Sequence, residues 1–273
     1  MRAGAASRVG GLVVKDVVEL WRHPGTVLPA LSMAVGSLVP AFLVAVVTPM
    51  ISGERLGESP EFVHAARGAL EAIPEMAPLA GAALVQAFLF HQFALLVLMV
   101  SVIGSMSLAA HAVVSEKAAR TLEPLLATPL STAELLTAKT LTPLGFALLL
   151  MWMTLAVYVI GIALFAEPGV ASAFLGRRVL LLFFLVGPLI TLVSLLLAVI
   201  ISSRVSDARS AQQLGALVVL PITAVFVAQL AGQFVLGPRI LLVSALGLAV
   251  LDVVLLWIGV RVFDRERILM KWK

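Results

Sequence analysis

Residues 178–204 read RVLLLFFLVGPLITLVSLLLAVIISSR, in which 25 uncharged residues separate two arginines. A helix needs about 20 apolar residues to cross the roughly 30 Å hydrocarbon core of a bilayer. The segment is therefore long enough for one membrane span. It must be helical, because lipid cannot satisfy exposed backbone polar groups.

The composition of the whole chain also indicates a membrane protein. Of its 273 residues, 61% are hydrophobic and 12% are charged, and the mean hydropathy is +1.11. Soluble domains have about 25% charged residues, so this chain has too little charge to cover a soluble globule. Soluble enzymes, disordered proteins and nucleic-acid-binding domains are disfavoured, and no nucleic-acid partner is expected. The absence of cysteine excludes disulfides and thiolate metal sites.

Other charge-poor intervals predict five more spans. The interval between Glu75 and Glu116 has 40 uncharged residues, too many for one simple span. Its start is rich in small residues and proline, so we interpret that part as a loop or interfacial stretch. The prediction is an all-α, polytopic membrane protein in which residues 1–273 form a single transmembrane domain. Its six spans are expected at about 26–49, 86–113, 133–165, 179–202, 212–234 and 240–261.

The positions of lysine and arginine predict the orientation in the membrane. With six spans, both termini share a side with the loops at 115–139 and 203–213. These four segments hold 14 of the 19 basic residues, leaving Arg55, Arg67, Arg177, Arg178 and Arg239 on the other side. Because cytoplasmic loops carry the excess of Lys and Arg, we expect a multi-pass protein of the cell (inner) membrane with both termini cytoplasmic. The extracytoplasmic loop at 51–82 contains a helix-compatible, amphipathic segment. The pair Arg177–Arg178 is in conflict with this orientation.

Residues 8–23 are predicted to form a separate helix at the membrane interface. Val14, Val17, Val18 and Trp21 follow the spacing of one helix face, and charged residues occupy the opposite face. The alternative is a cytosolic extension of the first span. The Pro24–Gly25 step favours a turn and so a separate helix.

The cytoplasmic loop at 115–131 carries the most specific pattern. Residues 115–141 read SEKAARTLEPLLATPLSTAELLTAKTL. Ser131 and Glu134 form a capping box, which predicts that the third span begins near Thr132. Upstream, Thr121 can cap a short helix that presents Leu122, Leu125 and Leu126. These leucines either enter the lipid interface or bind a protein partner.

This loop closely resembles the signature loop of type-2 ATP-binding-cassette (ABC) transporter permeases. The matching positions are Glu116, Thr121, Leu122, Glu123, Pro129, Leu130, Ser131, Glu134, Leu135 and Lys139. The stretch SSRVSDARSAQQLGALVVLP at 202–221 is similar to the second cytoplasmic loop of the same family. Arg120 stands where the family usually has glycine, and Ala118 and Ala119 replace charged residues.

The resemblance implies a transport function shared between several subunits. Two six-span permeases, either identical or paralogous, would pair with two cytosolic ATPase subunits, which would hold the ATP and Mg²⁺. The segment 119–127 would be the coupling helix that docks on the ATPase, with Glu116, Arg120, Thr121, Leu122, Glu123, Leu125 and Leu126 as coupling residues. The transporter is expected to be an exporter. No cofactor is expected in this chain, because none of its five lysines lies in a P-loop motif.

A few polar residues within the spans are candidates for the translocation path. Asp252 is an acidic residue inside the sixth predicted span. It either contacts a cation or cationic substrate, or forms a hydrogen bond within the bundle, for example to Gln229. Gln92, Gln229 and Gln233 either line a path or join helices.

Two other functional classes are disfavoured by the sequence. A membrane-embedded enzyme could use His91 or His111 with Ser101, Ser105 or Ser107, but these residues form no recognisable catalytic motif. A stand-alone transporter or channel is expected to have more ionisable residues within its spans.

The predicted topology can be tested with reporter tags. Tags at residues 1 and 273 should be cytoplasmic, and a tag at Glu58 should be outside. Termini on opposite sides would show an odd number of spans and contradict the six-helix prediction.

Overall fold

The computed structural model describes residues 27–53, 56–118, 132–204, 219–231 and 234–262, with only the backbone described at 110–118, 132–139, 202–204 and 262. Within these ranges the chain is helical and has no strand, which confirms the predicted all-α class. Five helices in this part of the chain are long and apolar enough to cross a membrane. The predicted interfacial helix at 8–23 and coupling helix at 119–127 lie outside the described residues.

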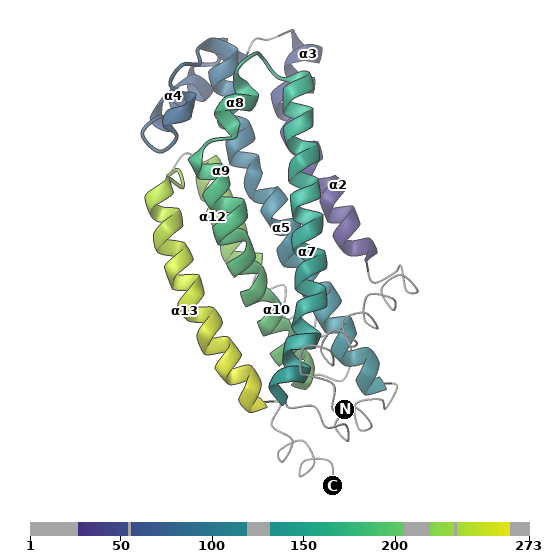
Figure 1. Ribbon diagram of the computed structural model, residues 1–273. Coiled ribbons are helices and arrows are strands. Elements are labelled where there is room, and N and C mark those ends of the chain that lie inside the picture. Colours follow the sequence, from purple (N-terminus) through teal and green to yellow (C-terminus); the bar gives the residue numbers. More distant parts are fainter. Residues whose placement is uncertain (1–26, 54–55, 119–131, 205–218, 232–233, 263–273) are drawn as a thin grey trace, which may run out of the picture.

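The helices run back and forth between two ends of an elongated bundle (Figure 1). The first span consists of α2 (Leu28–Phe42), the π-helical turn η2 (Leu43–Val47) and α3 (Thr48–Ser52). It is followed by α5 (Gly81–Ala118) and α7 (Thr132–Phe165). The next span joins α9 (Arg177–Leu181), the π-helical turn η5 (Leu182–Val186) and α10 (Gly187–Arg204).

The last two helices are α12 (Val219–Leu230) and α13 (Pro238–Val262). With 12 described residues, α12 is too short to count as a span by itself. Because residues 205–218 lie outside the description, the prediction of six spans stays a prediction.

Helix α5 begins at Gly81, five residues before the predicted start at 86. Of the stretch that we interpreted as loop, Gly81, Ala82 and Ala83 therefore belong to the first turn of α5, whereas residues 77–80 precede the helix. Alanine favours helix formation, and Leu84 and Val85 are buried against the rest of the bundle. The predicted loop at 51–82 is correspondingly shorter. Helix α7 is helical from Thr132, its first described residue; the start that the capping box predicts stays a prediction, because Ser131 lies outside the described residues.

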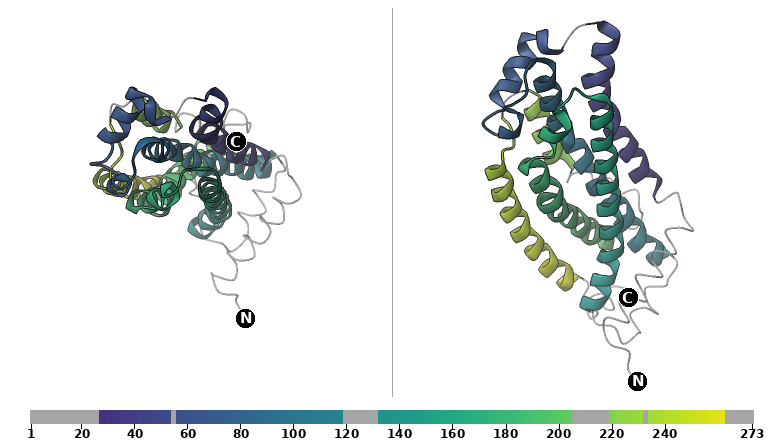
Figure 2. Two further views of the ribbon diagram at one scale, coloured as in Figure 1. Left: turned by 90° about the horizontal axis from the view of Figure 1, so that it is seen from above. Right: turned by 45° about the horizontal axis from the view of Figure 1, so that its top comes forward.

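The α5 helix is the centre of the bundle. It packs against α10, α2, α7 and α12 (Figure 2), and most of its membrane-spanning part is buried. The contact with α2 is made by small side chains: Ala30, Ala34, Ser37, Ala41 and Ala45 are the buried residues of the first span. A β-carbon at Gly104 would lie 3.2 Å from the Ala30 side chain. Small residues at such contacts allow helices to approach closely in a membrane.

Both π-helical turns have a backbone carbonyl that accepts a hydrogen bond from another helix. Gln86 of α5 donates through Nε2 to the Ala45 carbonyl at 3.1 Å. Trp152 of α7 donates through Nε1 to the Phe183 carbonyl at 3.1 Å. A π-turn interrupts the regular ladder of helix hydrogen bonds, and an unsatisfied carbonyl in lipid is costly. These side chains therefore compensate for the two irregular turns.

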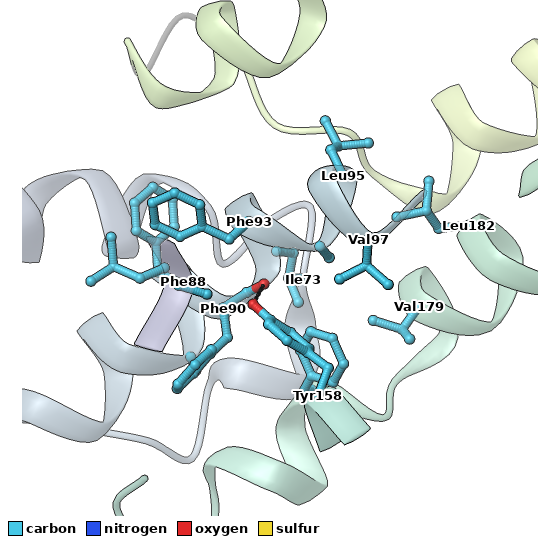
Figure 3. Close-up of a cluster of buried hydrophobic side chains, with 14 of the residues drawn as sticks. Ile73, Phe88, Phe90, Phe93, Leu95, Val97, Tyr158, Val179 and Leu182 are labelled. Atoms are coloured by element: carbon cyan, nitrogen blue, oxygen red, sulfur yellow. Dashed lines mark hydrogen bonds between the residues drawn. The ribbon is translucent and has the colours of Figure 1, made fainter. Parts of the chain in front are cut away.

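An aromatic cluster joins α2, α5, α7 and α8 (Val170–Phe174). Phe42, Phe90 and Tyr158 contact one another with ring centroids 5.3–5.7 Å apart. The Tyr158 hydroxyl donates to the Phe90 carbonyl at 3.0 Å (Figure 3). The cluster thus buries its one phenolic group with a partner, as an apolar core requires.

One end of the bundle is covered by short helices, and we call it the cap end. It contains η3 (Leu56–Glu58), α4 (Pro60–Gly68), η4 (Pro74–Met76) and α8 (Figure 1). Ile73 and Met76 from this region are fully buried. We call the opposite end, at which α5 ends and α7 begins, the far end.

The contact between η3 and α5 predicts a strong effect of one glycine. A β-carbon at Gly57 would lie 2.7 Å from the backbone nitrogen of Ala82, so Gly57→Ala must displace the start of α5. We expect a loss of about 1–3 kcal/mol, measured as a lower melting temperature in detergent. Gly68→Ala is the matched control, because its β-carbon meets nothing within 4 Å. Equal melting of the two variants would contradict this packing.

Candidate polar site in the helix bundle

The candidate site is built around Arg178, which lies in the first turn of α9. The start of this helix is fixed by Glu75, whose Oε1 accepts a hydrogen bond from the Arg177 backbone N–H at 2.9 Å. A β-carbon at Gly176 would lie 2.6 Å from Cδ of Glu75. The carboxylate of Glu75 therefore caps the helix N-terminus closely, and an anion there is favourable.

The guanidinium of Arg178 is fully buried and has only neutral hydrogen-bond partners among the described residues. Its Nε donates to the Leu236 carbonyl at 2.8 Å. One terminal nitrogen donates to the His91 carbonyl at 2.9 Å and lies 3.1 Å from His91 Nδ1. The other lies 3.4 Å from Gln229 Oε1. Buried charge is costly in a membrane unless it is paired or solvated by such groups, so carbonyl oxygens here take the place of a counter-ion.

Two glutamines continue this network. The amide oxygen Oε1 of Gln229 accepts the hydrogen bond from Arg178, and its Nε2 donates to Gln92 Oε1 at 3.1 Å. The positive charge requires that an oxygen faces it, so the amide of Gln229 must point its nitrogen toward Gln92. Both glutamines are buried. The structure thus brings together two of the predicted path residues, while Gln233 lies outside the described part of the chain.

Asp252 lies elsewhere, on the face of α13 that packs against α10. Leu255 and Leu248 of the same helix contact the cluster of Val193 and Leu196. Asp252 is 5% exposed, and neither carboxylate oxygen has a hydrogen-bond partner among the described residues. The hydrogen bond to Gln229 that the sequence left open is not formed, because the Gln229 amide bonds Arg178 and Gln92 instead.

A seam of hydroxyl groups joins α5 to α10 nearer the far end. Thr191 donates to Ser101 Oγ at 2.7 Å, and the hydroxyls of Ser105 and Ser194 are 2.9 Å apart. His91 and Ser101 are ten residues apart on α5, or about 15 Å along the axis. His91 therefore lies out of hydrogen-bond distance of Ser101, Ser105 and Ser107, the serines that the enzyme interpretation requires, and the side chain of His111 is not described.

Most of the predicted coupling residues lie outside the described residues. Glu116 belongs to the last turns of α5, and only its backbone is described. Arg120, Thr121, Leu122, Glu123, Leu125 and Leu126 lie outside the described residues.

Comparison with known families identifies the family to which the chain belongs. The model of the family described as ABC-2 type transporter matches residues 12–227. The chain belongs to the ABC-2 type transporter family. No curated protein and no solved structure matches it. The match confirms the resemblance and makes this multi-pass membrane protein an ABC transporter permease. Neither the membrane-enzyme nor the stand-alone alternative is favoured.

The role of Arg178 in this ABC-2 permease was missed at the sequence level. The only signal was the conflict between the pair Arg177–Arg178 and the charge asymmetry. The structure resolves half of that conflict, because Arg178 is buried in the bundle while Arg177 is exposed. A charge count treats the two residues alike, although only Arg177 behaves as a loop charge.

This difference in burial predicts that two adjacent substitutions change the stability by very different amounts. Arg178→Gln removes the donors to the Leu236 and His91 carbonyls and leaves buried acceptors unsatisfied. We expect a loss of about 3 kcal/mol, measured by thermal unfolding of the purified permease. Arg177→Gln should change stability by less than about 0.5 kcal/mol, because its side chain is exposed and its backbone cap is kept. A neutral Arg178→Gln variant would contradict the network.

Proposed function

We propose that this permease works as an exporter driven by a separate ATPase subunit that docks on the segment 119–127. Its family membership supports the proposal, since ABC-2 permeases normally work with an ATPase partner. ATP and Mg²⁺ would be held by that partner. A second permease copy or a paralogue would complete the path, and both termini would be cytoplasmic in the cell membrane.

The connection of the proposed docking segment to the bundle carries the proposal. The segment joins the end of α5 at Ala118 to the start of α7 at Thr132. With 38 and 34 residues, these helices are about 57 and 51 Å long, well beyond the roughly 30 Å apolar core. Both can therefore extend past the membrane at the far end. A force on this segment would act directly on α5, which contacts most of the other spans.

Among the path candidates, Asp252 is the residue best suited to a permeant cationic group. Neither of its oxygens is engaged by a described residue, whereas Gln92 and Gln229 are committed to the Arg178 network. We therefore propose Asp252 as the contact and the two glutamines as positioning residues. Gln233 remains a candidate from the sequence.

The docking proposal can be tested with Leu125→Glu. If Leu125 fills a cleft on the ATPase, the substitution buries an unpaired charge, which costs several kcal/mol. The tagged variant should insert normally but lose the ATPase activity that copurifies with the wild type from its native cells. Leu125→Met, which keeps apolar volume, is the matched control and should retain that activity.

Glu123→Gln should reduce coupling more mildly, because it removes one charge that can pair with a basic residue of the partner. Wild-type copurification and transport in Leu125→Glu would refute docking through this segment. The leucines would then be assigned to the lipid interface.

A further inference from the structure

Trp257 and Arg261 form a cation–π pair near the end of α13. The Arg261 guanidinium lies 3.4 Å from the centre of the Trp257 ring, a close cation–π contact. Both side chains are exposed. The spacing of four residues places them one above the other on the helix surface.

The depth of this pair in a bilayer follows from the length of α13. Arg239 and Arg261 are 22 residues apart on this helix, or about 33 Å along its axis. That distance matches the roughly 30 Å apolar core, so the two arginines lie near its two boundaries. The large side chains exposed between them, such as Leu246, Val250 and Val253, are apolar, as expected for a face toward lipid. Trp257 then lies at the level at which tryptophan is enriched in membrane proteins.

The stacking itself does not engage the N–H groups of Arg261. The indole covers one face of the planar guanidinium, but its five N–H groups point outward in the plane of the fork. In the described part of the chain, no salt bridge to Arg261 is present, and its positive charge lies at the C-terminal end of a helix. A phosphate oxygen at headgroup level has the charge and geometry that this fork recognises.

We propose that Trp257 and Arg261 form a binding site for the headgroup of an anionic phospholipid. The ring holds the guanidinium at the boundary between the apolar core and the headgroups, where the guanidinium binds the lipid phosphate. A zwitterionic lipid binds less well, because its own cationic group competes for the phosphate. This site is independent of the docking of an ATPase.

The site can be tested by quenching of tryptophan fluorescence with brominated lipids. The full chain with Trp21→Phe and Trp272→Phe is reconstituted in phosphatidylcholine vesicles that contain brominated phosphatidylglycerol or brominated phosphatidylcholine. Trp152 is not substituted, because its Nε1 donates the hydrogen bond to the Phe183 carbonyl. Its signal is subtracted by means of an otherwise identical Trp257→Phe variant. We expect phosphatidylglycerol to occupy the site about fivefold more strongly than phosphatidylcholine.

Matched substitutions at the two ends of α13 decide the outcome. Arg261→Gln should reduce the preference to about one, although the basic residues that follow in the sequence are unchanged. Arg239→Gln, at the opposite membrane boundary, should leave it intact. Arg261→Lys replaces Arg261→Gln if that variant fails to fold. It keeps the charge without the planar fork and should give an intermediate preference for phosphatidylglycerol. Equal quenching by both lipids in the parent chain, or an undiminished preference in a folded Arg261 variant, would overturn the proposal.

Discussion

A polar group inside this bundle is costly unless it finds a partner within the protein, because the hydrocarbon around the bundle offers none; Asp252 is an exception among the described residues. This requirement accounts for several hydrogen bonds between helices. Gln86 and Trp152 satisfy the carbonyls of Ala45 and Phe183 at the two π-turns. The Tyr158 hydroxyl is bound to the Phe90 carbonyl. In each case, a side chain of one helix completes the backbone of another, so the irregular turns also fix the helix positions.

The central position of α5 links these contacts to the transport function. Its cap-end half carries Gln86 and the His91 carbonyl that binds Arg178, and its other half carries the serines that bond α10. The sequence after its last residue leads into the proposed ATPase-docking segment. A displacement of α5 along its axis would therefore disturb hydrogen bonds at several levels of the bundle. This arrangement is suited to transmit a movement from the far end to the cap end.

The sequence predicted the helical class because lipid exposure imposes long apolar intervals, and such intervals are visible without tertiary information. The capping box at Ser131 likewise depends only on neighbouring residues, and α7 is helical from its first described residue, Thr132. The burial of Arg178 could not be predicted in this way. It depends on the Leu236 carbonyl and on His91, which lie 58 and 87 positions away. The π-turns also depend on donors from other helices, so no local pattern reveals them.

The partners of Arg178 also have a consequence for biosynthesis. His91 is synthesised before Arg178, but Gln229 and Leu236 are synthesised only after the fourth span. During that interval, the guanidinium lacks two of the acceptors that surround it in the finished protein. The cap-end part of this span can reach its final environment only when the start of α13 arrives. Insertion of the fourth span and its final packing are therefore separate events in time.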